Sequence, residues 1–62
     1  MPVVTVEWWE GRTVEQKKKL AEGITSVMVD MGIPAEATII IIKDNPKQNW
    51  SMGGKLASEQ SP

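Results

Sequence analysis

Four consecutive isoleucines at residues 39–42 constrain the fold of this chain more than any other feature of its sequence. Together with Thr38 and Lys43 they predict a β-strand over residues 38–43. A continuous apolar run is typical of a strand that is buried on both faces, as in a parallel sheet covered above and below. The 62 residues contain the pattern of only one helix, which can cover one face of so small a sheet. We therefore expect the second face to pack against another subunit.

A first strand is predicted over residues 2–9, which are rich in β-branched and aromatic side chains. Gly11 follows it as a turn residue. A helix is predicted over residues 14–31, because Thr13 and Gln16 have the spacing of a capping box and Gly32 stands where a helix commonly ends. Apolar side chains at steps of three and four form one stripe on this helix: Leu20, Ala21, Ile24, Val27, Met28 and Met31. Gly23 lies inside the helix, and we expect a close approach to the sheet there.

The remaining residues predict a short C-terminal appendage. Residues 44–49 are polar and turn-rich, residues 50–56 predict a short ribbon that docks on a neighbouring subunit, and residues 58–62 are expected to fray. The predicted fold class is α+β. It consists of a β-α-β subunit with two parallel strands, one helix and a short C-terminal ribbon, assembled into an oligomer. A single domain over residues 1–62 is expected.

Composition excludes several classes of function. The chain has neither cysteine nor histidine, so disulfides, thiolate zinc sites and Ser-His-Asp or Cys-His arrangements are impossible. No carboxylates have calcium-loop spacing, so we expect no metal site. The net charge of −1 argues against nucleic acid, and the three lysines at residues 17–19 indicate a solvated helix face. Without a membrane span or a signal pattern, a cytoplasmic protein is expected.

Pro2 is the first candidate for chemistry. Removal of Met1 would leave a free secondary amine at the start of a strand, and an apolar pocket would lower its pKa because burial disfavours the charged form. Such an amine could act as a general base at neutral pH. The alternative is that Pro2 merely begins a strand, where proline is tolerated. If Met1 is retained, the Pro2 nitrogen is an amide and cannot act as a base.

Arg12 is the only arginine and follows the first strand. A guanidinium binds carboxylates with two parallel hydrogen bonds, although an ordinary surface arginine is the alternative. The three tryptophans, Trp8, Trp9 and Trp50, can pack in a core, fill a subunit interface or line an apolar pocket.

Several of these residues together resemble one known family. The chain has Pro2 after Met1, then Glu10-Gly11-Arg12-Thr13-x-x-Gln16-Lys17, Ile33-Pro34, and finally Trp50-x-Met52-Gly53-Gly54-Lys55-Leu56. This pattern is similar to that of the 4-oxalocrotonate tautomerase family and covers nearly the whole chain.

The resemblance implies a homohexamer, usually a trimer of dimers, with active sites at subunit contacts and no cofactor or metal. It implies an enol–keto isomerase that acts on a 2-hydroxy-dienoate or a related enol acid, as in the degradation of aromatic compounds. Pro2 would be the base and then the acid, and Arg12 would bind a substrate carboxylate. Trp50 would occupy the aromatic position of the apolar pocket that keeps the proline pKa low. Trp9 and Met52 would line this pocket.

One position departs from the family. Ile39 stands where the well-studied members carry a second arginine, and Lys43, on the same face of the strand, would not form the same fork. A substrate with one carboxylate therefore fits better than the dicarboxylate 2-hydroxymuconate. Two alternatives stay open: hydrolytic dehalogenation or hydration of a 3-haloacrylate on the same scaffold, and a non-catalytic oligomeric binding protein that kept the fold.

Overall fold

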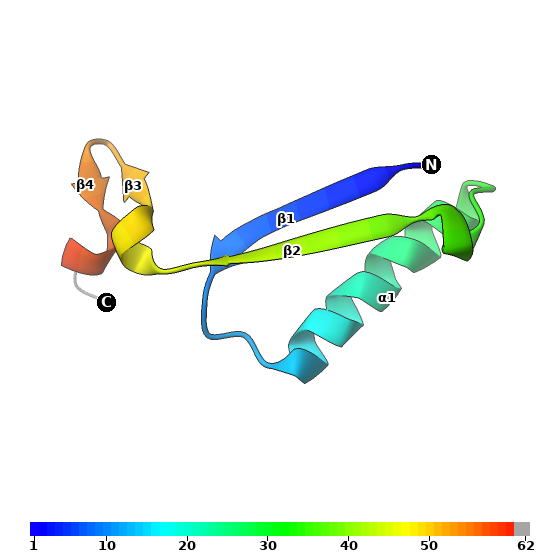
Figure 1. Ribbon diagram of the computed structural model, residues 1–62, viewed down its shortest axis with the longest axis horizontal. Helices are drawn as coiled ribbons and strands as arrows, with labels where there is room; N and C mark the ends of the chain where they lie inside the picture. The colour runs from blue at the N-terminus through cyan, green and yellow to red at the C-terminus, as the bar shows by residue number, and fades with distance from the viewer. Residues whose placement is uncertain (61–62) are drawn as a thin grey trace.

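The computed structural model describes residues 1–60. Strand β1 (Val3–Trp9) is followed by helix α1 (Val14–Asp30) and strand β2 (Ile39–Asn45), and the short strands β3 (Ser51–Met52) and β4 (Lys55–Leu56) form a C-terminal hairpin. Three 3₁₀ turns, Ala35–Ala37, Lys47–Asn49 and Ala57–Glu59, lie between or after these elements in the described residues. The predicted β-α-β fold with its C-terminal ribbon is confirmed (Figure 1).

Strands β1 and β2 are parallel and pair over their whole lengths, from Val3 opposite Ile39 to Trp9 opposite Asn45. Hydrogen bonds continue the pairing beyond both ends, from Ile39 N–H to the Pro2 carbonyl (3.0 Å) and from Glu10 N–H to the Asn45 carbonyl (2.9 Å). The second strand is longer than predicted, because its polar last residues still find backbone partners on β1. These residues were expected in a loop.

The two ends of α1 follow the predicted signals. The Thr13 hydroxyl accepts a hydrogen bond from Gln16 N–H (3.1 Å), and the Gln16 side-chain oxygen accepts one from Thr13 N–H (2.9 Å), so the capping box is complete. At the other end Gly32 has a φ of +89°, a conformation that glycine adopts without steric cost. The helix ends one residue before the predicted end.

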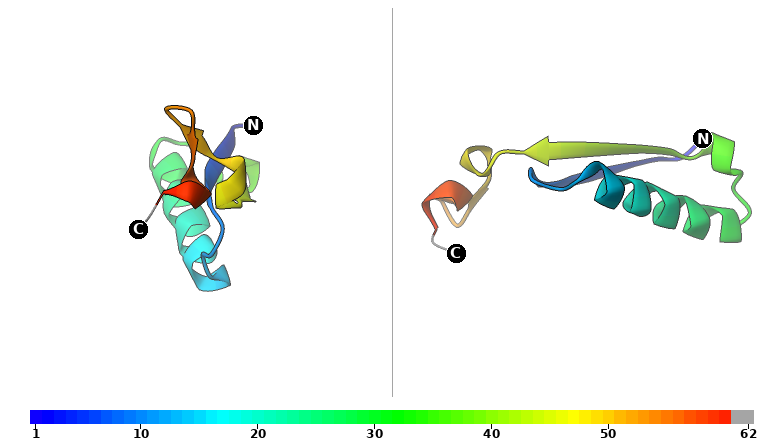
Figure 2. Two further views of the ribbon diagram at one scale, coloured as in Figure 1. Left: turned by 90° about the vertical axis from the view of Figure 1, so that its left-hand side faces the viewer. Right: turned by 90° about the horizontal axis from the view of Figure 1, so that it is seen from below.

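Helix α1 covers one face of the two-stranded sheet and leaves the other open (Figure 2). Side chains toward α1 are partly covered, for example Val6 and Ile42, whereas Val3 and Ile39 on the opposite face are exposed and Ile41 is 42% exposed. The second face of β2 is therefore not covered within the single chain, and its burial against another subunit stays a prediction. The physical reason is that one helix is the only layer that the described residues place against the sheet.

The apolar stripe of α1 is only partly directed at the sheet. Leu20, Ala21, Ile24 and Met28 are half-buried, but Val27 is 59% exposed and Met31 is 70% exposed. Lys17 is partly covered instead, one turn before Leu20. The close approach expected at Gly23 is also wrong, since a Cβ built there would have no neighbour within 4 Å.

The β3–β4 hairpin projects beyond the end of the sheet, away from the N-terminus (Figure 1). Gly53 and Gly54 form its turn, both with positive φ, and Ala57 N–H donates to the Trp50 carbonyl at 2.7 Å. Ala57, 5% exposed, is the only buried hydrophobic residue in the described part of the chain. The radius of gyration is 14.8 Å, against about 10.6 Å for a compact domain of this length, so the chain alone has almost no core.

None of the helices within residues 1–60 is long and apolar enough to cross a membrane.

Candidate active site

Pro2 lies at the start of β1, half-buried and next to the start of β2. Its carbonyl accepts the hydrogen bond from Ile39 N–H, so these two residues are neighbours at one end of the sheet. The C-terminal end of α1 lies at the same end of the molecule (Figure 1). Ile39, where the resemblance leads one to look for a second arginine, is therefore close to the candidate base.

The other predicted site residues, Trp9, Arg12, Trp50 and Met52, lie at the opposite end of the sheet or beyond it. A strand rises about 3.3 Å per residue, which places Pro2 and Trp9 about 23 Å apart. Within one chain Pro2 therefore cannot share a ligand with Arg12 or Trp50. A site that includes all five residues needs at least two chains.

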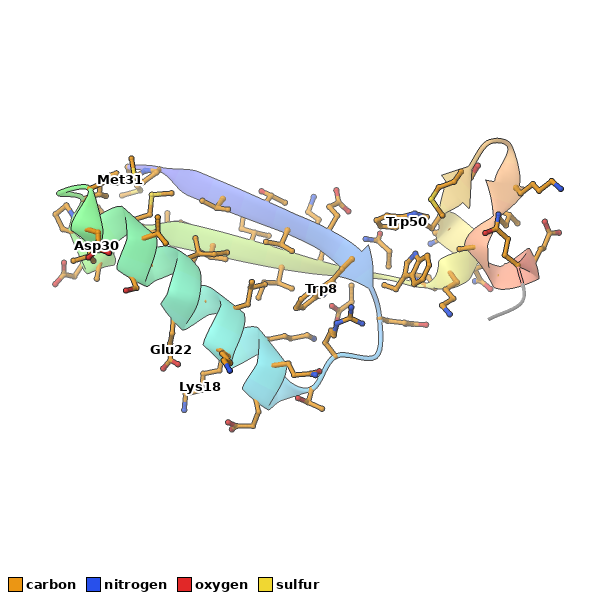
Figure 3. The ribbon with its side chains drawn as sticks, turned by 180° about the vertical axis from the view of Figure 1, so that it is seen from behind. Trp8, Lys18, Glu22, Asp30, Met31 and Trp50 are labelled. Atoms are coloured by element: carbon orange, nitrogen blue, oxygen red, sulfur yellow. The ribbon has the colours of Figure 1, made fainter. Side chains whose placement is uncertain are left out.

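Trp9 and Trp50 do meet. Their ring centroids are 5.9 Å apart and their planes make an angle of 79°, an edge-to-face contact. Lys47 Nζ lies 4.8 Å from the centroid of the Trp9 ring. Trp50 stands between the sheet and the hairpin (Figure 3), and Met52 follows it in β3 with its side chain exposed. This end of the molecule thus presents an aromatic pair with a nearby cation.

The indole N–H of Trp9 is buried without a hydrogen-bond acceptor among the residues that the structure describes. An unpaired buried donor costs about 1–3 kcal/mol, because it has given up its bond to water and gained none in return. The Lys47 cation near the centroid of this ring is a hydrogen-bond donor and cannot accept from the indole N–H.

Arg12 is exposed in the turn after β1. Its guanidinium carbon lies 5.0 Å from the centroid of the Trp8 ring, within the range of a cation–π contact. Within residues 1–60 the guanidinium makes no ion pair and no side-chain hydrogen bond. A cation held against an aromatic ring with its N–H groups unpaired can receive a carboxylate.

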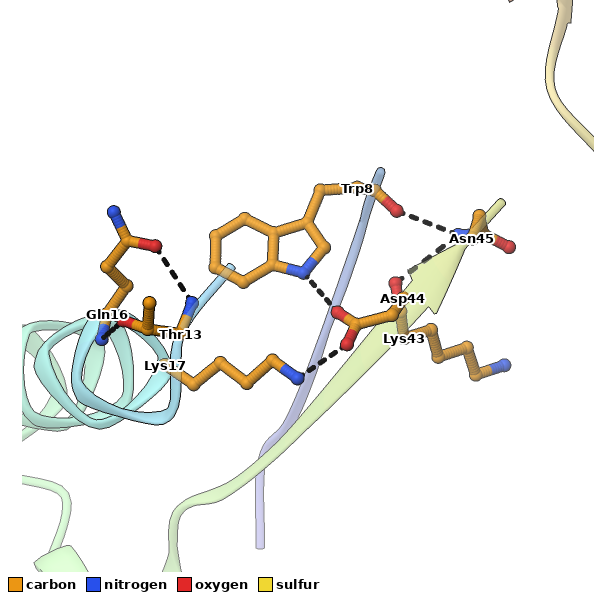
Figure 4. A network of polar contacts seen from close by, with 7 residues as sticks. All are labelled: Trp8, Thr13, Gln16, Lys17, Lys43, Asp44 and Asn45. Carbon is orange, nitrogen blue, oxygen red and sulfur yellow. Dashed lines mark hydrogen bonds and ion pairs between the residues drawn. The ribbon is translucent and has the colours of Figure 1, made fainter. Parts of the chain in front are cut away.

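Sequence reasoning missed the residues that surround this contact. Trp8 Nε1–H donates to Asp44 Oδ1 at 2.7 Å, and Lys17 Nζ lies 2.5 Å from Asp44 Oδ2 (Figure 4). The hydrogen bond from Lys17, and then the one from Trp8, lower the pKa of Asp44 below its usual value. Burial opposes this shift, and the charges of Lys17 and Arg12 lower the pKa by smaller amounts.

Two signals could have revealed these residues. Lys17 precedes Leu20 by three residues and Ala21 by four, so helical periodicity puts it on the covered face although its lysine neighbours face solvent. Asp44 lies two residues beyond Ile42 in strand alternation, which places it on the face of the sheet that α1 covers. Interpreting residues 17–19 as one charged run and residue 44 as a loop residue misses this arrangement. Lys17 and Asp44 face each other between the helix and the sheet.

A shallow hollow on the outer face of α1 contains none of the predicted site residues; it is lined by Glu15, Gln16, Lys18, Lys19 and Glu22. Lys18 and Glu22 point away from the sheet (Figure 3). Within the described residues, no group of three or more His, Cys, Asp or Glu side chains could hold a metal ion.

Residues 2–60 match the family model described as "Tautomerase enzyme". A "Probable tautomerase" of Bacillus cereus is 43% identical over 61 residues, which cover 97% of this chain and 100% of the relative. The 2-hydroxymuconate tautomerase of Comamonas testosteroni is 38% identical over 60 residues, which cover 95% of each chain.

Solved structures agree with this match. YwhB, a homologue of 4-oxalocrotonate tautomerase, is 34% identical with a TM-score of 0.91, over 97% of this chain and 100% of that one. A heterohexamer 4-oxalocrotonate tautomerase from Chloroflexus aurantiacus J-10-fl is 27% identical with a TM-score of 0.86, over 98% and 100%. Sequence and fold thus agree over nearly the full length, and the chain belongs to the 4-oxalocrotonate tautomerase family of isomerases.

Proposed function

We propose that this protein is a cofactor-independent tautomerase that ketonises a 2-hydroxy-dienoate with one carboxylate, at a site shared between subunits. The observation that carries the proposal is the placement of Pro2 and Arg12 at opposite ends of β1 in a chain of this family. Two such chains side by side, with their first strands running in opposite directions, would bring the Pro2 of one to the Arg12 of the other.

In this proposal the free Pro2 amine, exposed after loss of Met1, accepts the proton of the substrate 2-hydroxyl. The O–H electron pair forms the C2 carbonyl, and the π electrons shift along the diene toward C5. The protonated amine then returns the proton to C5, which gives the α,β-unsaturated ketone. The proton is conserved, and Pro2 ends the cycle as it began.

Arg12 would bind the substrate carboxylate and stabilise the negative charge that develops on the adjacent oxygen. Its unpaired guanidinium in the described part of the chain supports this role. Trp50, Trp9 and Met52 would form the apolar wall of the site. An apolar wall would keep the Pro2 pKa low, because burial disfavours the protonated amine.

A substrate with one carboxylate is proposed because the chain has one arginine. The residue beside Pro2 at the start of β2 is Ile39, which cannot bind a second carboxylate. The second carboxylate of 2-hydroxymuconate, the substrate named for the Comamonas testosteroni relative, would then lack a partner. An unmatched charged hydrogen bond typically costs about 1.5–3 kcal/mol.

We further propose a homohexamer, arranged as a trimer of dimers. The open apolar face of the sheet and the large radius of gyration support an assembly that buries this face. The heterohexamer described for the Chloroflexus aurantiacus relative supports six subunits of this size.

The test is the ultraviolet change on mixing the protein with 2-hydroxy-2,4-pentadienoate, after intact mass has shown that Met1 is absent. Ketonisation that is lost in Pro2→Ala and has a raised KM or a lowered kcat in Arg12→Ala would support the proposal. Wild-type rates in both variants would overturn these roles. Halide release from 3-chloroacrylate without ketonisation would favour the dehalogenase alternative. The absence of both reactions would favour a non-catalytic binding protein.

A further inference from the structure

Each oxygen of the Asp44 carboxylate contacts one donor. One oxygen accepts from Trp8 Nε1–H at 2.7 Å and the other contacts Lys17 Nζ at 2.5 Å (Figure 4). The three residues come from three different elements, β1, α1 and β2. Asp44 therefore fixes the orientation of the Trp8 indole and ties the first turn of α1 to the sheet.

The Arg12 guanidinium lies over the face of the same indole. The guanidinium carbon is 5.0 Å from the centroid of the Trp8 ring, so the orientation of the ring determines where the guanidinium rests. The Asp44 carboxylate lies at the edge of that ring, close enough for the charge of Arg12 to lower the pKa of Asp44. Nevertheless Arg12 and Asp44 do not form an ion pair.

An arginine beside a free carboxylate normally forms a bidentate pair, which would consume the N–H groups that a substrate needs. Lys17 Nζ contacts the second oxygen of Asp44, and the Arg12 guanidinium forms no ion pair with this carboxylate. We propose that Lys17 and Asp44 are positioning residues: Asp44 holds the Trp8 ring under Arg12, and Lys17 keeps Asp44 from capturing the guanidinium, so that Arg12 is left free for a carboxylate. The inference rests on the proposed function of Arg12 and adds two residues to it.

The single arginine provides a direct probe, since its Nε–Hε group gives one assignable signal in a ¹H–¹⁵N spectrum. We would compare Lys17→Met, Lys18→Met, Asp44→Ala and the double variant Lys17→Met/Asp44→Asn with the wild type, all in their native assembly. Lys18→Met is the matched control, because Lys18 is the neighbouring lysine but faces solvent. Each protein is titrated with 2-oxopentanoate, a monocarboxylate that resembles the ketone product.

In Lys17→Met the Arg12 signal is expected to move downfield, as Asp44 pairs with the guanidinium, and 2-oxopentanoate to bind about fivefold more weakly. Asp44→Ala is expected to weaken binding without the downfield shift, because it releases the Trp8 ring. The double variant restores binding to within about twofold, since the amide oxygen introduced by Asp44→Asn still accepts the Trp8 hydrogen bond but carries no charge. Lys18→Met is expected to behave like the wild type.

An unchanged Arg12 signal in Lys17→Met, or a double variant that binds as weakly as Lys17→Met, would overturn the inference. If the Lys17–Asp44 pair had a purely structural role, the double variant would bind 2-oxopentanoate as weakly as Lys17→Met does. If the downfield shift occurs but the wild type neither binds 2-oxopentanoate nor ketonises the dienoate, the proposed function fails while the arrangement around Arg12 stands.

Discussion

The rings of Trp9 and Trp50 meet edge to face, with centroids 5.9 Å apart and planes at 79°. Trp9 ends β1, whereas Trp50 stands between β2 and the hairpin, so this contact joins the hairpin to the sheet. Such aromatic pairs contribute about 0.5–1.5 kcal/mol beyond the area they bury. The cation of Lys47 above the Trp9 ring adds to the same junction.

Trp8 and Trp9 offer a matched comparison of two indole N–H groups. Trp8 Nε1–H donates to Asp44, but that of Trp9 has no acceptor in the described residues. We expect Trp8→Phe to lower the free energy of unfolding by about 1–2 kcal/mol more than Trp9→Phe does, because only Trp8 loses a hydrogen bond to a charged group. Chemical denaturation of both variants measures the difference. Equal losses would show that the Trp9 N–H is also hydrogen-bonded in the assembled protein.

The Lys17 contact is expected to control the titration of Asp44. The pKa of Asp44 is lower in the folded chain than in the unfolded one, so its ionisation stabilises the fold above about pH 4, and this contribution is lost as the pH falls through the folded-state pKa. Lys17→Met removes the largest cause and should raise the pKa of Asp44. Carboxyl ¹³C titration follows this directly, with Lys18→Met as the control. An Asp44 pKa that does not change in Lys17→Met would contradict the contact.

Ile39→Arg is expected to change the substrate preference. A guanidinium beside Pro2 could bind a second carboxylate, so the ratio of kcat/KM for 2-hydroxymuconate to that for 2-hydroxy-2,4-pentadienoate should rise about tenfold or more. Ile39→Gln, with a polar side chain but no charge, is the control and should not raise the ratio. An equal effect of both substitutions would mean that charge at this position does not select the substrate.

Ile41→Asp tests the open face of the sheet. Ile41 is 42% exposed in the single chain, and a carboxylate buried there in a subunit interface would be strongly unfavourable. We expect dissociation to smaller species in sedimentation velocity, with loss of activity. Ser26→Asp, which places the same charge on the outer face of α1, should leave the assembly intact. An Ile41→Asp protein of wild-type mass would show that this face is not an interface.

Local signals predicted most of the fold, because they depend on neighbouring residues. The capping box of Thr13 and Gln16 and the glycine after α1 are both found where expected. The end of β2 was placed too early, since Asp44 and Asn45 continue the strand only because Trp8 and Trp9 lie beside them. That pairing joins residues 36 positions apart, and the residue types near position 44 do not indicate that the strand continues.

The candidate site was less predictable from the sequence. Its residues were named from motifs, and the separation of Pro2 from Arg12 follows from the extended strand predicted between them. The Asp44 contacts with Trp8 and Lys17 depend on the helix lying over one face of the sheet. Periodicity could have indicated that Lys17 faces the sheet, but not that it meets a carboxylate there.

In the proposed function each active site combines Pro2 of one chain with Arg12 of another, and mixing the two impaired variants probes this pairing across a subunit boundary. Pro2→Ala and Arg12→Ala proteins are unfolded together, refolded together and assayed with 2-hydroxy-2,4-pentadienoate. Random assembly should restore an intact pair in roughly a quarter of the sites and a matching share of wild-type activity. If the mixture is no more active than the separate variants although hybrid oligomers form, Pro2 and Arg12 do not act together across a subunit boundary.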